Sequence, residues 1–105
     1  MKLDGVFNCE TKTPIGVQAS TLTFDVSEDG RHFTGTSESN TGTLEFLDGQ
    51  IEGNRMSWRM KVTNPIKIEL TCDGELVGDD LSVTINAGWA GKMQLRGTRT
   101  ITVRR

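Results

Sequence analysis

The chain is poor in the residues that build metal sites and has no long apolar run. It holds one histidine and two cysteines among 105 residues. Without a CxxC or HxxxH spacing, a zinc site would have to gather ligands scattered along the chain. No stretch approaches the ~18 apolar residues of a membrane span. We therefore expect no metal, no cofactor and no membrane partner.

An excess of positive charge and a secretory leader are also missing. The formal net charge is -2, whereas general nucleic-acid binders concentrate basic residues on one face. The first residues, Met1 to Gly5, show no basic segment followed by an apolar stretch. We expect a soluble protein in the cytoplasm that binds no nucleic acid.

Proline is scarce, whereas glycine and threonine are abundant. Two Pro, twelve Gly and fourteen Thr fit strands joined by tight turns, because β-branched residues suit a pleated surface and Gly supplies turn dihedrals. A domain usually needs on the order of 100 residues, so residues 1–105 are expected to form one domain.

Apolar and polar residues alternate with a period of two in several segments, which is typical of strands with one buried face. The clearest segment is 55–63, where Met56, Trp58, Met60 and Val62 share one face. Segments 66–72 and 80–87 repeat the pattern. The sequence predicts eight strands, at 2–10, 17–26, 31–38, 43–52, 55–63, 66–77, 80–87 and 92–104.

These strands predict an all-β fold, an eight-stranded antiparallel up-and-down meander closed into a small barrel. Pairing of the first strand with the last would remove both sheet edges. The alternative is a two-sheet β-sandwich, which also buries one face of each strand.

Two turns predict matching hairpins 25 residues apart in the chain. A two-residue turn at 53–54 pairs Ile51 with Met56, and the same turn at 78–79 pairs Leu76 with Leu81. In this register Gly49 leaves room for Trp58, and Gly74 leaves room for Val83.

Two further loops predict registers and surface charge pairs. A loop at 27–30 pairs Phe24 with Phe33 and sets Asp25 beside His32, a surface ion pair or the orienting half of an acid/base site. A loop at 63–65 pairs Trp58 with Leu70 and sets Arg59 across from Glu69.

Cys72 shares the face of Ile66, Ile68 and Leu70, which favours a buried thiol. With Cys9 as the only other cysteine, we expect two free thiols; the alternative is one disulfide.

One segment resembles a known family. Asp29-Gly30-Arg31-His32-Phe33-Thr34-Gly35-Thr36-Ser37-Glu38-Ser39 resembles the second hairpin of avidin-like barrels, where an Asp-Gly turn leads into a Thr-Gly-Thr strand. The predicted architecture is similar to the wider calycin group of ligand-binding barrels. Because Leu3-Asp4-Gly5-Val6-Phe7 lacks the Gly-x-Trp strand of avidin-like proteins, the resemblance implies the architecture but no biotin site.

Arg99 is the most informative polar residue, because it shares the parity of apolar residues in segment 93–103. An inward guanidinium must be paired or hydrated, and its planar fork suits a carboxylate or phosphate. Arg99 is therefore a candidate anchor for an anionic ligand. The alternatives are a bulge at Gly97 that reverses the parity, or a position at the rim bonded to a carboxylate such as Glu45 or to backbone carbonyls.

Trp58, Met56, Met60 and Met93 are candidates for a pliable apolar ligand pocket, since methionine adapts to irregular shapes; plain core is the alternative. Trp89 lies among small residues in Gly88-Trp89-Ala90-Gly91. It is expected to be a lid over the barrel mouth, a contact with another subunit, or a plug over the core.

The sequence leaves three function classes open. One is a barrel that binds a small apolar or anionic ligand in its interior. Another is an interaction or structural module with a filled barrel, expected to be a homo-oligomer. The third is a small enzyme. Because the sequence contains no recognisable catalytic set, we favour the two non-enzyme classes.

Overall fold

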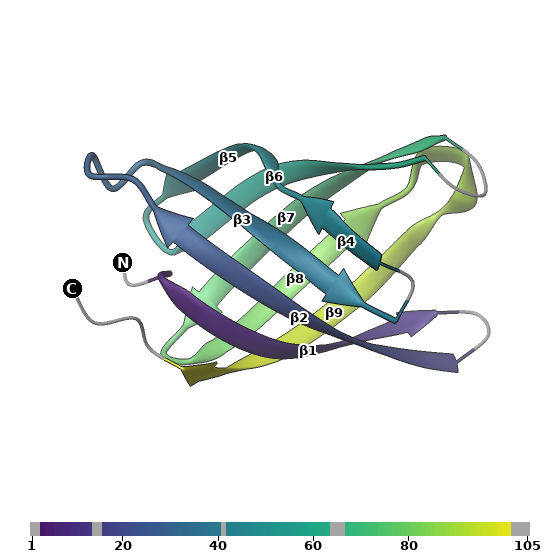
Figure 1. Ribbon diagram of the computed structural model, residues 1–105, viewed down its shortest axis with the longest axis horizontal. Coiled ribbons are helices and arrows are strands. Elements are labelled where there is room, and N and C mark those ends of the chain that lie inside the picture. The colour runs from purple at the N-terminus through teal and green to yellow at the C-terminus, as the bar shows by residue number, and fades with distance from the viewer. Residues whose placement is uncertain (1–2, 14–15, 41, 64–66, 102–105) are drawn as a thin grey trace.

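The computed structural model describes residues 3–13, 16–40, 42–63 and 67–101, which form a closed all-β barrel (Figure 1). A 3-10 helix, η1 (Gly88–Ala90), precedes the last strand. The strands within the described residues are β1 (Gly5–Thr13), β2 (Gly16–Val26), β3 (His32–Ser39), β4 (Gly42–Glu45), β5 (Leu47–Glu52), β6 (Arg55–Val62), β7 (Ile68–Val77), β8 (Asp80–Asn86) and β9 (Lys92–Ile101).

The strands close the barrel as the sequence predicts. Each strand pairs antiparallel with its neighbours, β1 pairs with β9, and β2 pairs with β3. Since β4 and β5 both pair with β3, they share one position, and the described strands fill eight positions. The fold is thus the predicted barrel and not the two-sheet sandwich. No helix in the described ranges is long and apolar enough to cross a membrane.

The predicted strand 43–52 is wrong in one respect, because it is interrupted between β4 and β5. Asp48 has a φ of 53°, and the register with β6 shifts between Leu47 and Gln50. Phe46 lies at the break with its side chain buried, and its N–H donates to the carbonyl of Gly35 at 2.9 Å. The predicted strand is therefore interrupted at Phe46, and a bulge follows within β5.

The two matching hairpins are confirmed. Ile51 lies opposite Met56, and Leu76 lies opposite Leu81. Gly53 and Gly78 have φ of 64° and 62°, the left-handed conformation that the first position of a Gly-first hairpin turn needs.

The predicted register between β2 and β3 is wrong by two residues. Phe24 lies opposite Gly35, and Phe33 lies opposite Val26. The loop keeps its predicted length but lies one residue further along the chain, at 28–31, because the Ser27 N–H donates to the carbonyl of His32 at 2.8 Å and closes the turn at that pair.

The register between β6 and β7 is also two residues from the prediction. Trp58 lies opposite Cys72 rather than Leu70. Arg59 nevertheless donates to the Glu69 carboxylate at 2.8 Å, because its long side chain reaches diagonally across the strands. A shift of two residues keeps every side chain on its predicted face, so the core is unchanged.

A single apolar cluster lies inside the barrel around five aromatic rings. Phe24 contacts Phe7, Phe33, Phe46 and Trp58, and the last three also contact one another, with ring centroids 5.0 to 6.2 Å apart. Most neighbouring pairs meet edge to face, an arrangement that adds to the stabilisation from buried area.

Cys9 and Cys72 are buried free thiols, as predicted. Burial raises the pKa of each thiol from an ordinary value of 9.0 to about 12, because the thiolate would lose its hydration.

These raised pKa values predict a fall in stability at alkaline pH. Between pH 9 and 12 the unfolded chain releases thiol protons that the folded chain retains, so unfolding is favoured as pH rises. The free energy of unfolding should fall by up to about 1.4 kcal/mol per pH unit for each thiol. Urea titrations from pH 7 to 11 would measure this decline, and the double variant Cys9→Ala/Cys72→Ala should decline less steeply. Parallel curves for the two proteins would contradict it.

Candidate functional site

Four of the six predicted ligand-site residues lie on one interior face of the barrel. Met56, Trp58 and Met60 alternate along β6. The pairings Trp58–Cys72, Cys72–Ile85 and Ile85–Met93 form one row across β6, β7, β8 and β9. Met93 therefore belongs to the same inward row as Trp58.

Trp58 carries a polar atom that the protein leaves unmatched. Its side chain is 2% exposed, and its Nε1 has no hydrogen-bond partner among the described residues. A buried donor without an acceptor costs about 1–3 kcal/mol. The hydroxyl of Ser20, which faces inward from β2, is also buried and has no hydrogen-bond partner among the described residues.

Both ends of the barrel carry apolar side chains that are only half-buried against the core. At the N-terminal end, which holds the turns at 53–54 and 78–79, Leu3 is fully buried, whereas Val26 and Ile51 are half-buried. At the opposite end, where β1, β3, β6 and β8 end, the half-buried residues are Leu44, Val62, Ile68 and Met93.

Arg99 faces inward as the parity predicts, since it lies opposite the buried Phe7. Its side chain is 6% exposed, its Nε donates to Asp79 Oδ1 at 2.9 Å, and its guanidinium also donates to the carbonyl of Asp4. The guanidinium carbon lies 4.9 Å from the centre of the Phe7 ring. The guanidinium charge is therefore paired with protein groups at the N-terminal end of the barrel. Its partner is not Glu45, which is exposed on β4.

Trp89 lies on η1 with its side chain 80% exposed. A plug over the core would be buried, so the expectation that Trp89 plugs the core is wrong for the single chain. The expected lid and subunit contact are compatible with the exposure.

His32 is paired with Asp29 and not with the predicted Asp25. His32 Nδ1 lies 3.0 Å from Asp29 Oδ2, whereas Asp25 lies opposite Thr34. Hydrogen bonds from the Ser27 hydroxyl, the Arg31 N–H and His32 lower the pKa of Asp29 below its ordinary value. The pair is exposed where the loop after β2 enters β3, so it is a surface contact rather than an acid/base site.

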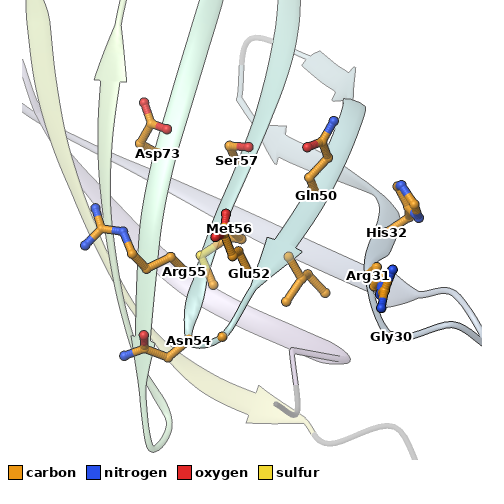
Figure 2. Close-up of a pocket in the computed structure, with 12 residues that line it drawn as sticks. Gly30, Arg31, His32, Gln50, Glu52, Asn54, Arg55, Met56, Ser57 and Asp73 are labelled. Carbon is orange, nitrogen blue, oxygen red and sulfur yellow. The ribbon is translucent and has the colours of Figure 1, made fainter.

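A depression of about 1000 Å³ is lined by polar side chains of the outer wall together with Ile51 and Met56 (Figure 2). Gln50, Ser57 and Asp73 form one outward row across neighbouring strands. Nearby, Arg55 lies 3.6 Å from Glu75 and His32 is engaged by Asp29. This polar surface is open and carries no buried unpartnered group among the described residues, so we assign it no function.

A smaller depression, of about 610 Å³, lies where β2 separates from β3. It is lined by the inward-facing Ser20 and by Glu10 and Glu38 from the outer face. The two carboxylates make it an unfavourable place for an anion.

Sequence reasoning missed Ser20 and the partners of Arg99. The sequence did contain a signal for these partners, because the predicted pairing of the first strand with the last brings Asp4 close to Arg99. The turn at 78–79 lies at the same end. Ser20 carried no signal, since a serine in a strand is ordinarily solvated.

The chain matches no protein-family model, no curated protein and no solved structure. Within residues 3–13, 16–40, 42–63 and 67–101, no three His, Cys, Asp or Glu side chains gather where they could hold a metal ion.

Proposed function

We propose that this barrel binds a small, uncharged, largely apolar molecule beside Trp58, through one hydrogen-bond acceptor on the ligand. The observation that carries the proposal is the buried Nε1 of Trp58, which has no acceptor among the described residues. A ligand carbonyl or ether oxygen would satisfy this donor. The alternative acceptor is a buried water molecule.

The surroundings of Trp58 favour an apolar and uncharged ligand. The buried core residues are apolar, and the inward-facing charge of Arg99 is already paired with Asp79 at the N-terminal end. A charged ligand in that interior would lose its hydration and gain no counter-ion. The expected anionic ligand is therefore left out of the proposal, and so is Arg99, whose guanidinium is engaged by Asp79 and Asp4.

Three methionines provide a means of making room. Met56 and Met60 flank Trp58 along β6, and Met93 is half-buried toward the opposite end. Methionine side chains repack at low cost because they are unbranched and flexible. A ligand would enter past the half-buried residues of that end and displace these side chains. Calycin-like barrels of eight strands are of a size that holds one small ligand.

The test compares two probes of similar shape, 2-acetylnaphthalene with a carbonyl and 2-ethylnaphthalene without one. In a Trp89→Phe background, Trp58 is the only tryptophan, and its fluorescence reports on binding. We expect the carbonyl probe to bind about five- to tenfold more tightly, the effect of one net hydrogen bond. Trp58→Phe keeps an aromatic ring, loses the donor and should abolish this preference, measured by competition with a fluorescent neutral probe.

Two results would contradict the proposal. One is the absence of saturable binding by either probe up to its solubility limit. The other is a preference for the carbonyl probe that stays undiminished in the Trp58→Phe variant, which would show that the indole donor is not used. Native mass spectrometry of the purified protein would identify a ligand retained from the cell.

A second candidate function is an interaction module. Trp89, at 80% exposure on a loop of small residues, favours it, because an isolated exposed tryptophan is typical of a binding surface. Absence of ligand binding together with a partner contact through Trp89 would support this function instead.

A further inference from the structure

Strand β2 has a neighbour on both sides over only part of its length. Its pairing with β1 is continuous from Phe24 to Gly16. Its pairing with β3 ends at Thr21 opposite Glu38. Within the described residues, 16–20 therefore pair with a strand on one side only. In Figure 1 the β1–β2 hairpin runs on past the end of β3.

This segment lacks the features that usually protect a sheet edge. Its sequence, Gly16-Val17-Gln18-Ala19-Ser20, contains no charge and no proline, and its pairing with β1 shows no bulge. Lysine, proline and bulges are the usual means by which edge strands avoid pairing with other chains. Val17 is 61% exposed, which leaves apolar area at the same edge.

We propose that residues 16–20 pair antiparallel with the same segment of a second copy of this chain, with Gln18 on the two-fold axis. Val17 then lies opposite Ala19 of the second copy, and both side chains are on the outward face. Gln18 lies opposite its own copy, where each amide can donate and accept. The remaining pair joins Gly16 with Ser20, two small residues.

The self-complementarity of the segment favours a second copy over an unrelated extended peptide. In this register no charged residues oppose each other, and an apolar pair is matched at two symmetric positions. One two-fold contact satisfies the free edges of both chains at once. An interface of two five-residue edges falls below the standard size of about 1,200–2,000 Å², so the dimer forms at high protein concentration.

The experiment measures self-association by sedimentation equilibrium from 10 µM to 1 mM protein. Val17→Lys/Ala19→Lys sets lysine opposite lysine at both symmetric pairs, whereas Val17→Glu/Ala19→Lys, the Lys/Glu variant, sets lysine opposite glutamate. Within one chain this variant also places each new charge opposite an unlike charge of β1, Lys12 or Glu10. Both positions are exposed, so folding should persist and is checked by circular dichroism. We expect the wild type and the Lys/Glu variant to dimerise, and the Lys/Lys variant to associate about tenfold more weakly or worse.

Two control variants show whether the contact lies at the β2 edge. Ser82→Lys/Thr98→Lys adds the same charge at exposed positions of β8 and β9 and should dimerise like the wild type. Trp89→Ser should also dimerise. A wild type that stays monomeric at 1 mM overturns the proposal, as does a Lys/Lys variant that dimerises normally or a Lys/Glu variant that does not. Loss of the dimer in Trp89→Ser alone would assign the contact to η1. None of these results depends on ligand binding beside Trp58.

Discussion

Replacing Gly49 by alanine is expected to lower the free energy of unfolding by about 3 kcal/mol or more, at the upper end of overpacking effects. A Cβ at Gly49 would fall on the backbone carbonyl oxygen of Phe33 and lie 2.9 Å from two carbons of its ring. Gly49 and Phe33 are pairing partners in β5 and β3. The carbonyl cannot retreat without disturbing this pairing, and the ring is held within the aromatic cluster.

The matching position of the second hairpin provides the control. A Cβ at Gly74 would lie 2.8 Å from Met56 Sδ, 3.1 Å from a methyl carbon of Val83 and 3.2 Å from the carbonyl oxygen of Ser82, so its one contact under 3.0 Å is with a flexible thioether. A thioether can move aside, so Gly74→Ala should cost about 1 kcal/mol. Chemical denaturation of both variants would measure the difference. Equal losses would mean that the Phe33 contact does not determine the need for glycine at position 49.

The comparison of these glycines shows what the sequence could and could not predict. The repeat predicts close approach at both positions, and Val83 does contact the site of Gly74. At Gly49 the three atoms nearest to an added Cβ belong to Phe33 of β3 and not to the predicted Trp58, and the bulge at Asp48 interrupts the register with β6 there. Local alternation identifies the buried face but not which strand supplies the opposing side chain.

Turn chemistry explains which registers were predictable. Two-residue turns with glycine first allow one pairing, so the hairpins at 53–54 and 78–79 follow from sequence. The loop after β2 depends on hydrogen bonds of Ser27 and Asp29 that a residue count does not include. Because a shift by two residues preserves the faces, the alternation provides no correction.

The residues of the candidate site that lie within one strand were predictable from the sequence, whereas the contacts between strands were less so. Met56, Trp58 and Met60 follow from alternation within one strand. Met93 joins their row only through three successive registers, one of which was predicted two residues away. The partners of Arg99 come from the chain start and from a turn 20 residues earlier, and closure of the barrel brings them together.

Arg99→Met is expected to lower the free energy of unfolding by about 2–3 kcal/mol, the scale of lost hydrogen bonds to a charged group. The side chain connects β9 to the turn at Asp79 and to the segment before β1 through the carbonyl of Asp4. Asp4 Oδ1 in turn accepts from the N–H of Val26 at 2.6 Å, at the end of β2. Removal of the guanidinium therefore loosens the contact of three elements at the N-terminal end.

Two controls show whether this loss comes from the buried contacts. Arg96→Met removes the same charge from an exposed position of β9 and should change stability by less than about 0.5 kcal/mol. Asp79→Asn weakens a partner that is 70% exposed and should cost less than about 1 kcal/mol, because water replaces it. Urea denaturation of the three variants would rank them. If Arg99→Met were as stable as Arg96→Met, the guanidinium would not be holding the barrel together. An inward charge that contributes nothing to stability would then again be a candidate anchor for an anion, and the proposal of an uncharged ligand beside Trp58 would lose one of its supports.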